Sequence, residues 1–255
     1  MIANYHTHTW RSNHAEGSEE SYVIAALEQG LSVLGFSDHT PYWFPDGYVS
    51  AIRMSLGQLA DYCDVVRNLR KKYEEKIRIP LGLELEYYPD CLPKLLPILR
   101  DHGIEYLLLG QHFLGNEAGE HYSGRPTEDR NVLERYCRQS MDAMQTGLFT
   151  YFAHPDLIHF VGDEKIYREH MRGLCREAKS CGLPLEINML GLWTGRHYPD
   201  LRFWELAAEE GCSVVIGCDA HAPEHLKQAD AEEKAMEIVR RLDLSLLETV
   251  PLQKL

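Results

Sequence analysis

Short apolar runs alternate along the chain with longer segments in which apolar residues recur at helical spacing. Each apolar run has the length of a strand and leads directly into polar residues. The runs cover residues 2–5, 33–37, 79–83, 106–110, 151–153, 185–187 and 214–217. The expected helices include residues 19–29, 56–73, 129–146, 165–181 and 202–210. Four of these helices are followed at once by glycine, the residue that most often ends a helix.

This order of elements predicts an α/β fold. Strands that alternate with helices pair in parallel through right-handed crossovers, and seven such units can close into a barrel. The length of 255 residues suits one barrel of this kind. No internal repeat and no long flexible linker divides the chain, so residues 1–255 are expected to form a single domain.

Composition narrows the range of partners. The formal net charge is −13, which disfavours a broad nucleic-acid surface. No apolar run reaches the roughly 18 residues needed to span a membrane, and the N-terminus has no secretion signal, so a cytoplasmic protein is expected. The seven cysteines include no CxxC pair and predict no disulfide framework. The oligomeric state is left open.

Residues that can bind metals gather where the strands end. His6 and His8 stand two apart on an extended segment, so both rings can reach one ion. Further candidates follow later strands: His39, His112, His154, and the pair Asp219 and His221. Glu84 lies among apolar residues, where an unpaired charge is costly. In a barrel these ends form one rim, which predicts a metal site there. Five other histidines are expected at the surface: His102, His121, His159, His170 and His225.

Six motifs follow one another along the chain: HTHTWRSNH at 6–14, SDHTP at 37–41, GLE at 82–84, QHF at 111–113, AHPD at 153–156 and CDAH at 218–221. This ordered set resembles the polymerase-and-histidinol-phosphatase (PHP) superfamily of metal-dependent phosphoesterases, and within it the stand-alone histidinol-phosphatase-like members. The resemblance covers almost the whole chain. It implies a distorted (β/α)7 barrel with a trinuclear metal site at the C-terminal rim of the strands.

The same resemblance implies nine ligands for three divalent ions. One ion would be held by His6, His8, Glu84 and Asp219, a second by Glu84, His112 and His154, and a third by His14, His39 and His221. Glu84 would therefore bridge two ions, and Glu16 is an available substitute for His14. Nitrogen and oxygen ligands without thiolate suit Zn, Mn or Fe equally.

The implied activity is hydrolysis of a small phosphate monoester, with L-histidinol phosphate of histidine biosynthesis as the leading substrate. A metal-bridging water, held by Glu84 with His6, His8 and Asp219, would attack phosphorus. One alternative is a phosphatase or phosphodiesterase acting on another small metabolite. An alternative of a different class is a noncatalytic metal-binding or regulatory module.

Residues outside the ligand set are expected to bind substrate or orient ligands. Arg196 offers the forked geometry that matches phosphate oxygens, and His197 is a second candidate in the same loop. Asn188 is expected either to bind substrate or to cap the rim. Asp38, beside His39, is expected to orient a ligand, with a cap or turn role as its alternative.

Two long segments, 40–55 and 114–128, are expected to form a lid over the site. Each contains an arginine, Arg53 and Arg125, for which a surface position is expected.

Overall fold

A parallel sheet forms the centre of the molecule. The computed structural model describes residues 1–44, 47–118 and 121–255, so residues 45–46 and 119–120 of the two segments expected to form a lid lie outside it. Within the described residues the sheet has seven strands in the order β3–β4–β5–β6–β7–β8–β9, all parallel. They are β3 (Phe36–His39), β4 (Leu81–Leu85), β5 (Tyr106–Leu109), β6 (Tyr151–Phe152), β7 (Leu185–Asn188), β8 (Ser213–Gly217) and β9 (Ser245–Leu246). A separate parallel pair consists of β1 (Ala3–Asn4) and β2 (Val33–Leu34).

The expected strand at 33–37 is divided into β2 and β3, and its backbone pairs with two neighbours on both sides of Gly35. The amides of Leu34 and Phe36 donate to the carbonyls of Arg78 and Pro80, over 2.9 and 3.2 Å. The amides of Gly35 and Ser37 donate to the carbonyls of Asn4 and Thr7, over 2.7 and 2.9 Å. A Cβ at Gly35 would lie 2.4 Å from the hydroxyl oxygen of Tyr106, so glycine lets the strand pass close to this tyrosine.

Residues 6–8 lie between β3 and the residues that follow β8. The amide of His8 donates to the carbonyl of Ala220 over 2.9 Å, and the amide of Ala220 donates to the carbonyl of His6 over 3.2 Å. On the other side, the amide of Ser37 donates to the carbonyl of Thr7 over 2.9 Å. This short segment links β3 to the residues that follow β8, so the barrel is closed by backbone hydrogen bonds.

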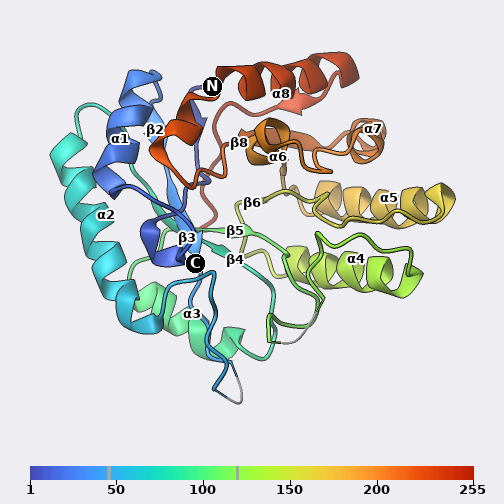
Figure 1. Ribbon diagram of the computed structural model, residues 1–255, viewed down its shortest axis with the longest axis horizontal. Coiled ribbons are helices and arrows are strands. Elements are labelled where there is room, and N and C mark those ends of the chain that lie inside the picture. The colour runs from blue at the N-terminus through green and yellow to red at the C-terminus, as the bar shows by residue number, and fades with distance from the viewer. Residues whose placement is uncertain (45–46, 119–120) are drawn as a thin grey trace.

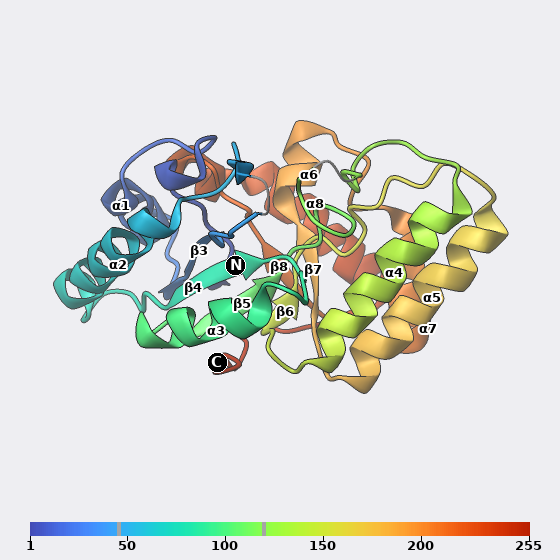
Figure 2. The ribbon, with the colours of Figure 1, turned by 90° about the horizontal axis from the view of Figure 1, so that it is seen from below.

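Helices surround the strands (Figure 1). They are α1 (Glu19–Glu28), α2 (Leu59–Tyr73), α3 (Leu92–Asp101), α4 (Arg130–Gln145), α5 (Glu164–Ser180), α6 (Met189–Thr194), α7 (Leu201–Glu210) and α8 (Ala229–Leu242). The 3-10 helices are η1 (Trp10–Ser12), η3 (Leu56–Gln58) and η4 (Pro223–Lys227). Figure 2 shows α4 beside α5 on one flank of the barrel.

Local sequence explains where these helices start and stop. The carboxylate of Asp163 accepts a hydrogen bond from the amide of Ile166 and caps α5, and Asp200 caps α7 in the same way. Gly211 ends α7 with a φ of 69°, as its position predicts. The five expected helices are confirmed, except that the first turn of 56–73 is the separate helix η3. Within the described residues, no helix is long and apolar enough to cross a membrane.

The barrel interior is filled by aromatic and aliphatic side chains below the rim. Tyr5, Tyr106, Leu108 and Tyr151 form a buried cluster, and alternate residues of the same strands face the helices. Val250, five residues before the C-terminal Leu255, packs against this cluster from the end at which the strands begin. The opposite end, where the strands finish, is left for the polar residues.

We predict that Gly82→Ala destabilises the barrel. A Cβ at this position would lie 2.3 Å from ring atom Cε1 of Tyr106, inside the packed interior. Overpacking of this kind costs about 1–3 kcal/mol, so the free energy of unfolding, measured by urea denaturation, should fall by that amount.

The control is Gly173→Ala in α5, where a Cβ would meet no atom of the described residues within 4 Å beyond the helix's own backbone. This variant should gain up to about 1 kcal/mol, because alanine favours a helix over glycine. Equal stabilities for the two variants would contradict the packing argument.

A second prediction concerns Asp156, which joins the end of β6 to α7. Its buried carboxylate accepts hydrogen bonds from Trp204 Nε1 over 3.0 Å and from the amide of Asp200 over 2.6 Å. Burial raises the pKa of Asp156 from 3.8 to about 7. The folded protein therefore holds this proton more tightly than the unfolded chain, and stability falls as the pH rises from about 4 to about 7.

Asp156→Asn keeps an acceptor oxygen and cannot titrate in this range. Relative to the wild type, its free energy of unfolding should rise steadily between pH 4 and pH 7 and change no further above that. Urea denaturation at each pH, with chelator in every sample, tests this. Parallel curves for the two proteins would exclude a raised pKa at Asp156.

Candidate metal centre

Glu84 stands at the centre of the rim cluster. Its neighbours on β4, Leu83 and Leu85, face the helices, and the alternation of the strand turns Glu84 inward. The next strand leaves room for it at Gly110, where a Cβ would lie 2.0 Å from Glu84 Oε1. The carboxylate is 1% exposed. The alternation of β4 and the space at Gly110 therefore bury the charge of Glu84 among other side chains, away from solvent.

Five imidazole nitrogens surround this carboxylate. Oε2 of Glu84 lies 3.1 Å from His39 Nδ1, 3.5 Å from His8 Nε2 and 3.6 Å from His6 Nε2. Oε1 lies 2.9 Å from His154 Nε2 and 3.6 Å from His112 Nε2. The histidines come from four different segments, because His6 and His8 share one, and each segment lies at a strand end as the sequence predicts.

Asp219 supplies a second carboxylate at the end of β8. Its Oδ1 lies 3.1 Å from His8 Nε2 and 3.5 Å from both His6 Nε2 and His221 Nδ1. The backbone at Asp219 has a φ of 50°, and that at His154 has a φ of 34°. Such conformations are costly for residues other than glycine and are concentrated at functional sites.

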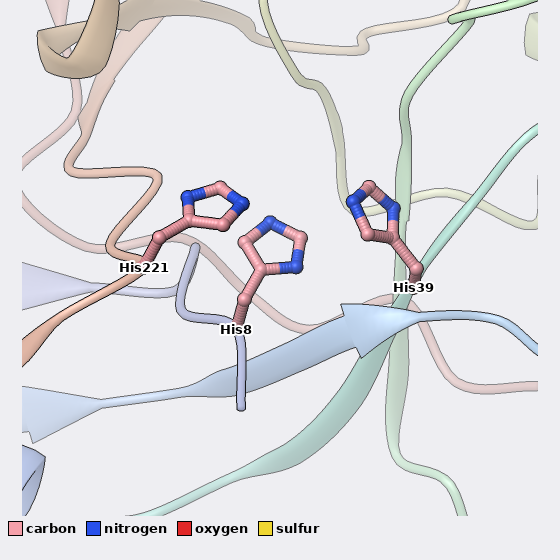
Figure 3. A group of neighbouring side chains, drawn as sticks. All are labelled: His8, His39 and His221. Carbon is pink, nitrogen blue, oxygen red and sulfur yellow. The ribbon is translucent and has the colours of Figure 1, made fainter. Parts of the chain in front are cut away.

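Four overlapping groups of three side chains have ligand atoms within 4.8 Å of one another. They are His6, His8 and Asp219; His6, Glu84 and His154; His39, Glu84 and His112; and His8, His39 and His221. Figure 3 shows the last group, in which the rings come from three separate segments and lie side by side, with His8 between His221 and His39. Because these groups share members, they form one continuous cluster that could hold divalent metal.

His14, expected to act with His39 and His221, lies at the exposed edge of this group. Its Nε2 lies 3.0 Å from His221 Nε2, and its ring stacks on that of His39 with 5.3 Å between the ring centroids. His8 lies with His39 and His221 as well. Glu16, the expected substitute, is also exposed and contacts His221 through its backbone amide over 2.8 Å.

The cluster fits a divalent cation. Glu84 Oε2, His8 Nδ1, His39 Nδ1 and His154 Nδ1 are buried, and none has a hydrogen-bond partner among the described residues. Buried polar atoms are nearly always paired, so these atoms point to a missing partner. Carboxylate and imidazole donors without sulfur suit Zn, Mn or Fe.

Burial and the close packing of carboxylates with imidazoles shift the pKa values in the cluster. Burial alone would raise the pKa of Glu84, but His112, His6 and His39 hold it well below its usual range. Burial opposes protonation of His8, yet its contacts with Asp219 and Asp38 raise its pKa to about 9. Burial and the nearby His8 lower the pKa of His39 to about 3. Because imidazole binds a metal only when neutral, metal binding at this cluster would release protons.

Glu186 is part of the site and was missed by the sequence analysis. It is fully buried, and its Oε1 accepts a hydrogen bond of 2.8 Å from His6 Nδ1. Its Oε2 accepts from the amide of His154 over 3.0 Å. The signal was present, because Glu186 lies between the apolar residues Leu185 and Ile187, just as Glu84 lies between leucines.

A cavity of about 590 Å³ opens beside the cluster. It is lined by candidate ligands and by aromatic and basic residues that include Tyr122, Trp193, Arg125 and Arg196. Arg196 donates to the hydroxyl of Tyr198 over 2.8 Å. His225 also lines the cavity, and its Nδ1 accepts from the amide of His221 over 3.0 Å, so the expected surface position was wrong for this histidine.

Asn188 and His197, the other residues expected to bind substrate, make contacts within the protein. Asn188 is buried, its Oδ1 caps α6 by accepting from the amide of Gly191, and its Nδ2 donates to Glu186 and Asp219. This geometry matches the capping alternative. His197 Nε2 pairs with the carbonyl of Leu157 over 2.8 Å, and its ring stacks on that of His159. Neither residue is among those lining the cavity within the described chain.

Asp38 lies beside His8 as well as His39. Its Oδ1 is 3.5 Å from His8 Nδ1 and accepts from the backbone amide of His39 over 2.8 Å. Its Oδ2 accepts from the hydroxyl of Thr9.

The expectation of a surface position was wrong for Arg53, which is 3% exposed and paired with Glu86 and Glu117. Arg125 borders the cavity.

Comparisons with known proteins agree with this architecture. The pattern of the PHP domain matches residues 4–189. A Deinococcus radiodurans protein named "Probable histidinol-phosphatase" is 30% identical over 232 residues, covering 87% of each chain. The histidinol-phosphatase of Bacillus subtilis is 24% identical over 250 residues, covering 85% of this chain and 92% of the relative.

A solved structure shares the fold along the whole chain. The histidinol phosphate phosphatase of Lactococcus lactis, solved with zinc, L-histidinol and phosphate, is 20% identical. It superposes with a TM-score of 0.78 over 99% of this chain and 98% of its own. The likeness confirms the fold class expected from the sequence. Since the PHP pattern matches more than half of the chain, the protein belongs to the PHP domain family.

Proposed function

We propose that the protein is a metal-dependent phosphatase that hydrolyses L-histidinol phosphate to L-histidinol and phosphate. The observation that carries the proposal is the buried carboxylate of Glu84 among five imidazoles, beside a cavity that Arg196 borders. Relatives named histidinol-phosphatase along nearly the same length support the reaction and its substrate. The activity is assigned to residues 1–255 as one domain that acts on a small metabolite in the cytoplasm.

The proposed centre holds three divalent ions. Glu84 would be shared by two of them, with His6, His8 and Asp219 on one side and His112 and His154 on the other. His39 and His221 would hold the third, completed by His14. The zinc in the Lactococcus lactis structure supports Zn, and the donor set fits Mn or Fe as well. When bound, such ions activate water as a nucleophile and neutralise charge on the phosphate.

The chain's own residues would position the reactants. The guanidinium of Arg196, which donates to the hydroxyl of Tyr198, would bind phosphate oxygens. Glu186 fixes the ring of His6 by accepting a hydrogen bond from its Nδ1. The opposite ring nitrogen, Nε2, then faces Glu84 and Asp219. The cations would give the cavity a positive potential despite the net charge of −13, so an anionic substrate is attracted locally.

The substrate assignment predicts selective turnover. Protein loaded with Mn or Zn should release phosphate from L-histidinol phosphate with a kcat/KM of ~10⁴ M⁻¹s⁻¹ or more, within the ordinary enzyme range. Other small phosphomonoesters should react far more slowly. Slow, indiscriminate turnover would exclude the named substrate and favour another metabolite, and no turnover with all metals bound would favour a noncatalytic module.

The metal mechanism predicts that His8→Ala abolishes most activity without unfolding the protein. A ligand that supports several kcal/mol of metal catalysis should cost about 100-fold or more in kcat. The control is His102→Ala at the end of α3, where the ring nitrogen Nδ1 contacts the carbonyl of Ile98. It should keep wild-type activity. Circular dichroism checks that both variants fold, and a fully active His8→Ala variant would disprove the mechanism.

A further inference from the structure

A buried arginine connects two rim segments to the edge of the candidate metal centre. Arg53 NH1 and NH2 donate to Oε2 and Oε1 of Glu86, each over 2.9 Å, which makes a two-pronged ion pair. Arg53 Nε donates to Glu117 Oε2 over 2.7 Å. All three side chains are at most 5% exposed. We call these residues, Arg53, Glu86 and Glu117, the Arg53 network.

The network reaches the metal centre through His112. His112 Nδ1 lies 2.9 Å from Glu86 Oε1, and its Nε2 lies 3.6 Å from Glu84 Oε1. Because a carboxylate can only accept hydrogen bonds, Glu86 requires the proton on Nδ1. The lone pair of a neutral His112 ring is then on Nε2 and faces Glu84, where a metal ligand needs it.

The same network fixes both segments that border the cavity. Arg53 NH1 also donates to the carbonyl of Thr40 over 3.0 Å. Glu117 Oε1 accepts from the hydroxyls of Tyr48 and Ser50, over 3.0 and 2.6 Å. Residues 47–53 and 113–117 are thereby held against one guanidinium, and Ile52 and Phe113 from these segments line the cavity.

The charges of the Arg53 network indicate that it does more than pack the protein interior. The Arg53 network buries two carboxylates against one guanidinium, which leaves one excess negative charge next to His112. Buried ion pairs are weak stabilisers, because apolar residues of similar volume often do as well. An excess negative charge behind a ligating imidazole strengthens that ligand toward a cation.

We propose that Arg53 and Glu86 are positioning residues that hold His112 as a metal ligand and make metal binding depend on both rim segments. This inference rests on the proposed metal centre. It does not depend on which phosphate ester is the substrate.

The first test is Glu86→Gln. Three donors converge on Glu86, two from Arg53 and one from His112, and an amide with a single acceptor oxygen cannot satisfy them. The affinity for Zn or Mn, measured without substrate by competition with a chromophoric chelator, should fall about 10–100-fold. The His112 Nδ1 proton of zinc-saturated protein should also move upfield in NMR spectra, because its charge-assisted hydrogen bond is lost. In turnover, kcat should fall while KM changes little, since Glu86 does not line the cavity within the described chain.

Arg53→Lys provides the second variant, with Arg11→Lys as its matched control. Arg11 is likewise buried between two carboxylates: it pairs with Glu19 and, at 3.1 and 2.5 Å, with Asp61. Its guanidinium contacts α1 and α2 and no candidate metal ligand of the described residues. Both variants should lower the melting temperature, and only Arg53→Lys should weaken metal binding.

Two results would overturn the proposal. One is wild-type metal affinity together with an unchanged His112 Nδ1 resonance in either Glu86→Gln or Arg53→Lys. The other is an equal loss of metal affinity in Arg11→Lys, which would attribute the effect to general destabilisation. If Glu86→Gln fails to fold, Arg53→Lys carries the test, because it keeps a cation between the two glutamates.

Discussion

The carboxylate of Glu84 is buried at the end of β4, with five imidazole nitrogens within 3.6 Å of its oxygens. A charge in that position is stable only if cations or donors surround it, and the structure supplies them from four separate strand ends. Gly110, directly after the neighbouring strand β5, leaves the space that this carboxylate occupies. The arrangement of the rim therefore follows from one buried charge.

Closure of the barrel and assembly of the site use the same residues. The segment that carries His6 and His8 also makes the backbone hydrogen bonds to Ala220 and Ser37 that join β3 to the residues after β8. Asp219, beside Ala220, is brought to His6 and His8 by the same contacts. Glu186 and Glu86 then set the orientation of His6 and His112 from behind. A change that opens the barrel at this seam should disturb the candidate ligands as well.

Much of this arrangement can be read from local sequence, and the remainder depends on contacts between distant residues. The apolar runs and the glycines after helices predicted the strands and most helix ends, and the parallel order predicted a common rim. The close approach of Tyr106 to Gly35 was missed because the two residues lie far apart in sequence. The pairing of Arg53 with Glu86 and Glu117 has no local signal either, since the three residues meet only after folding. Glu186 could have been found by the criterion that selected Glu84.

The central claim is that Glu84 is shared between metal ions. Anomalous diffraction from crystals of the protein loaded with Zn or Mn tests it most directly, because the scattering locates each ion independently of activity. The account predicts two ions that each contact one oxygen of Glu84, and a third beside His39 and His221. Ions bound at full occupancy with none in contact with Glu84 would contradict it.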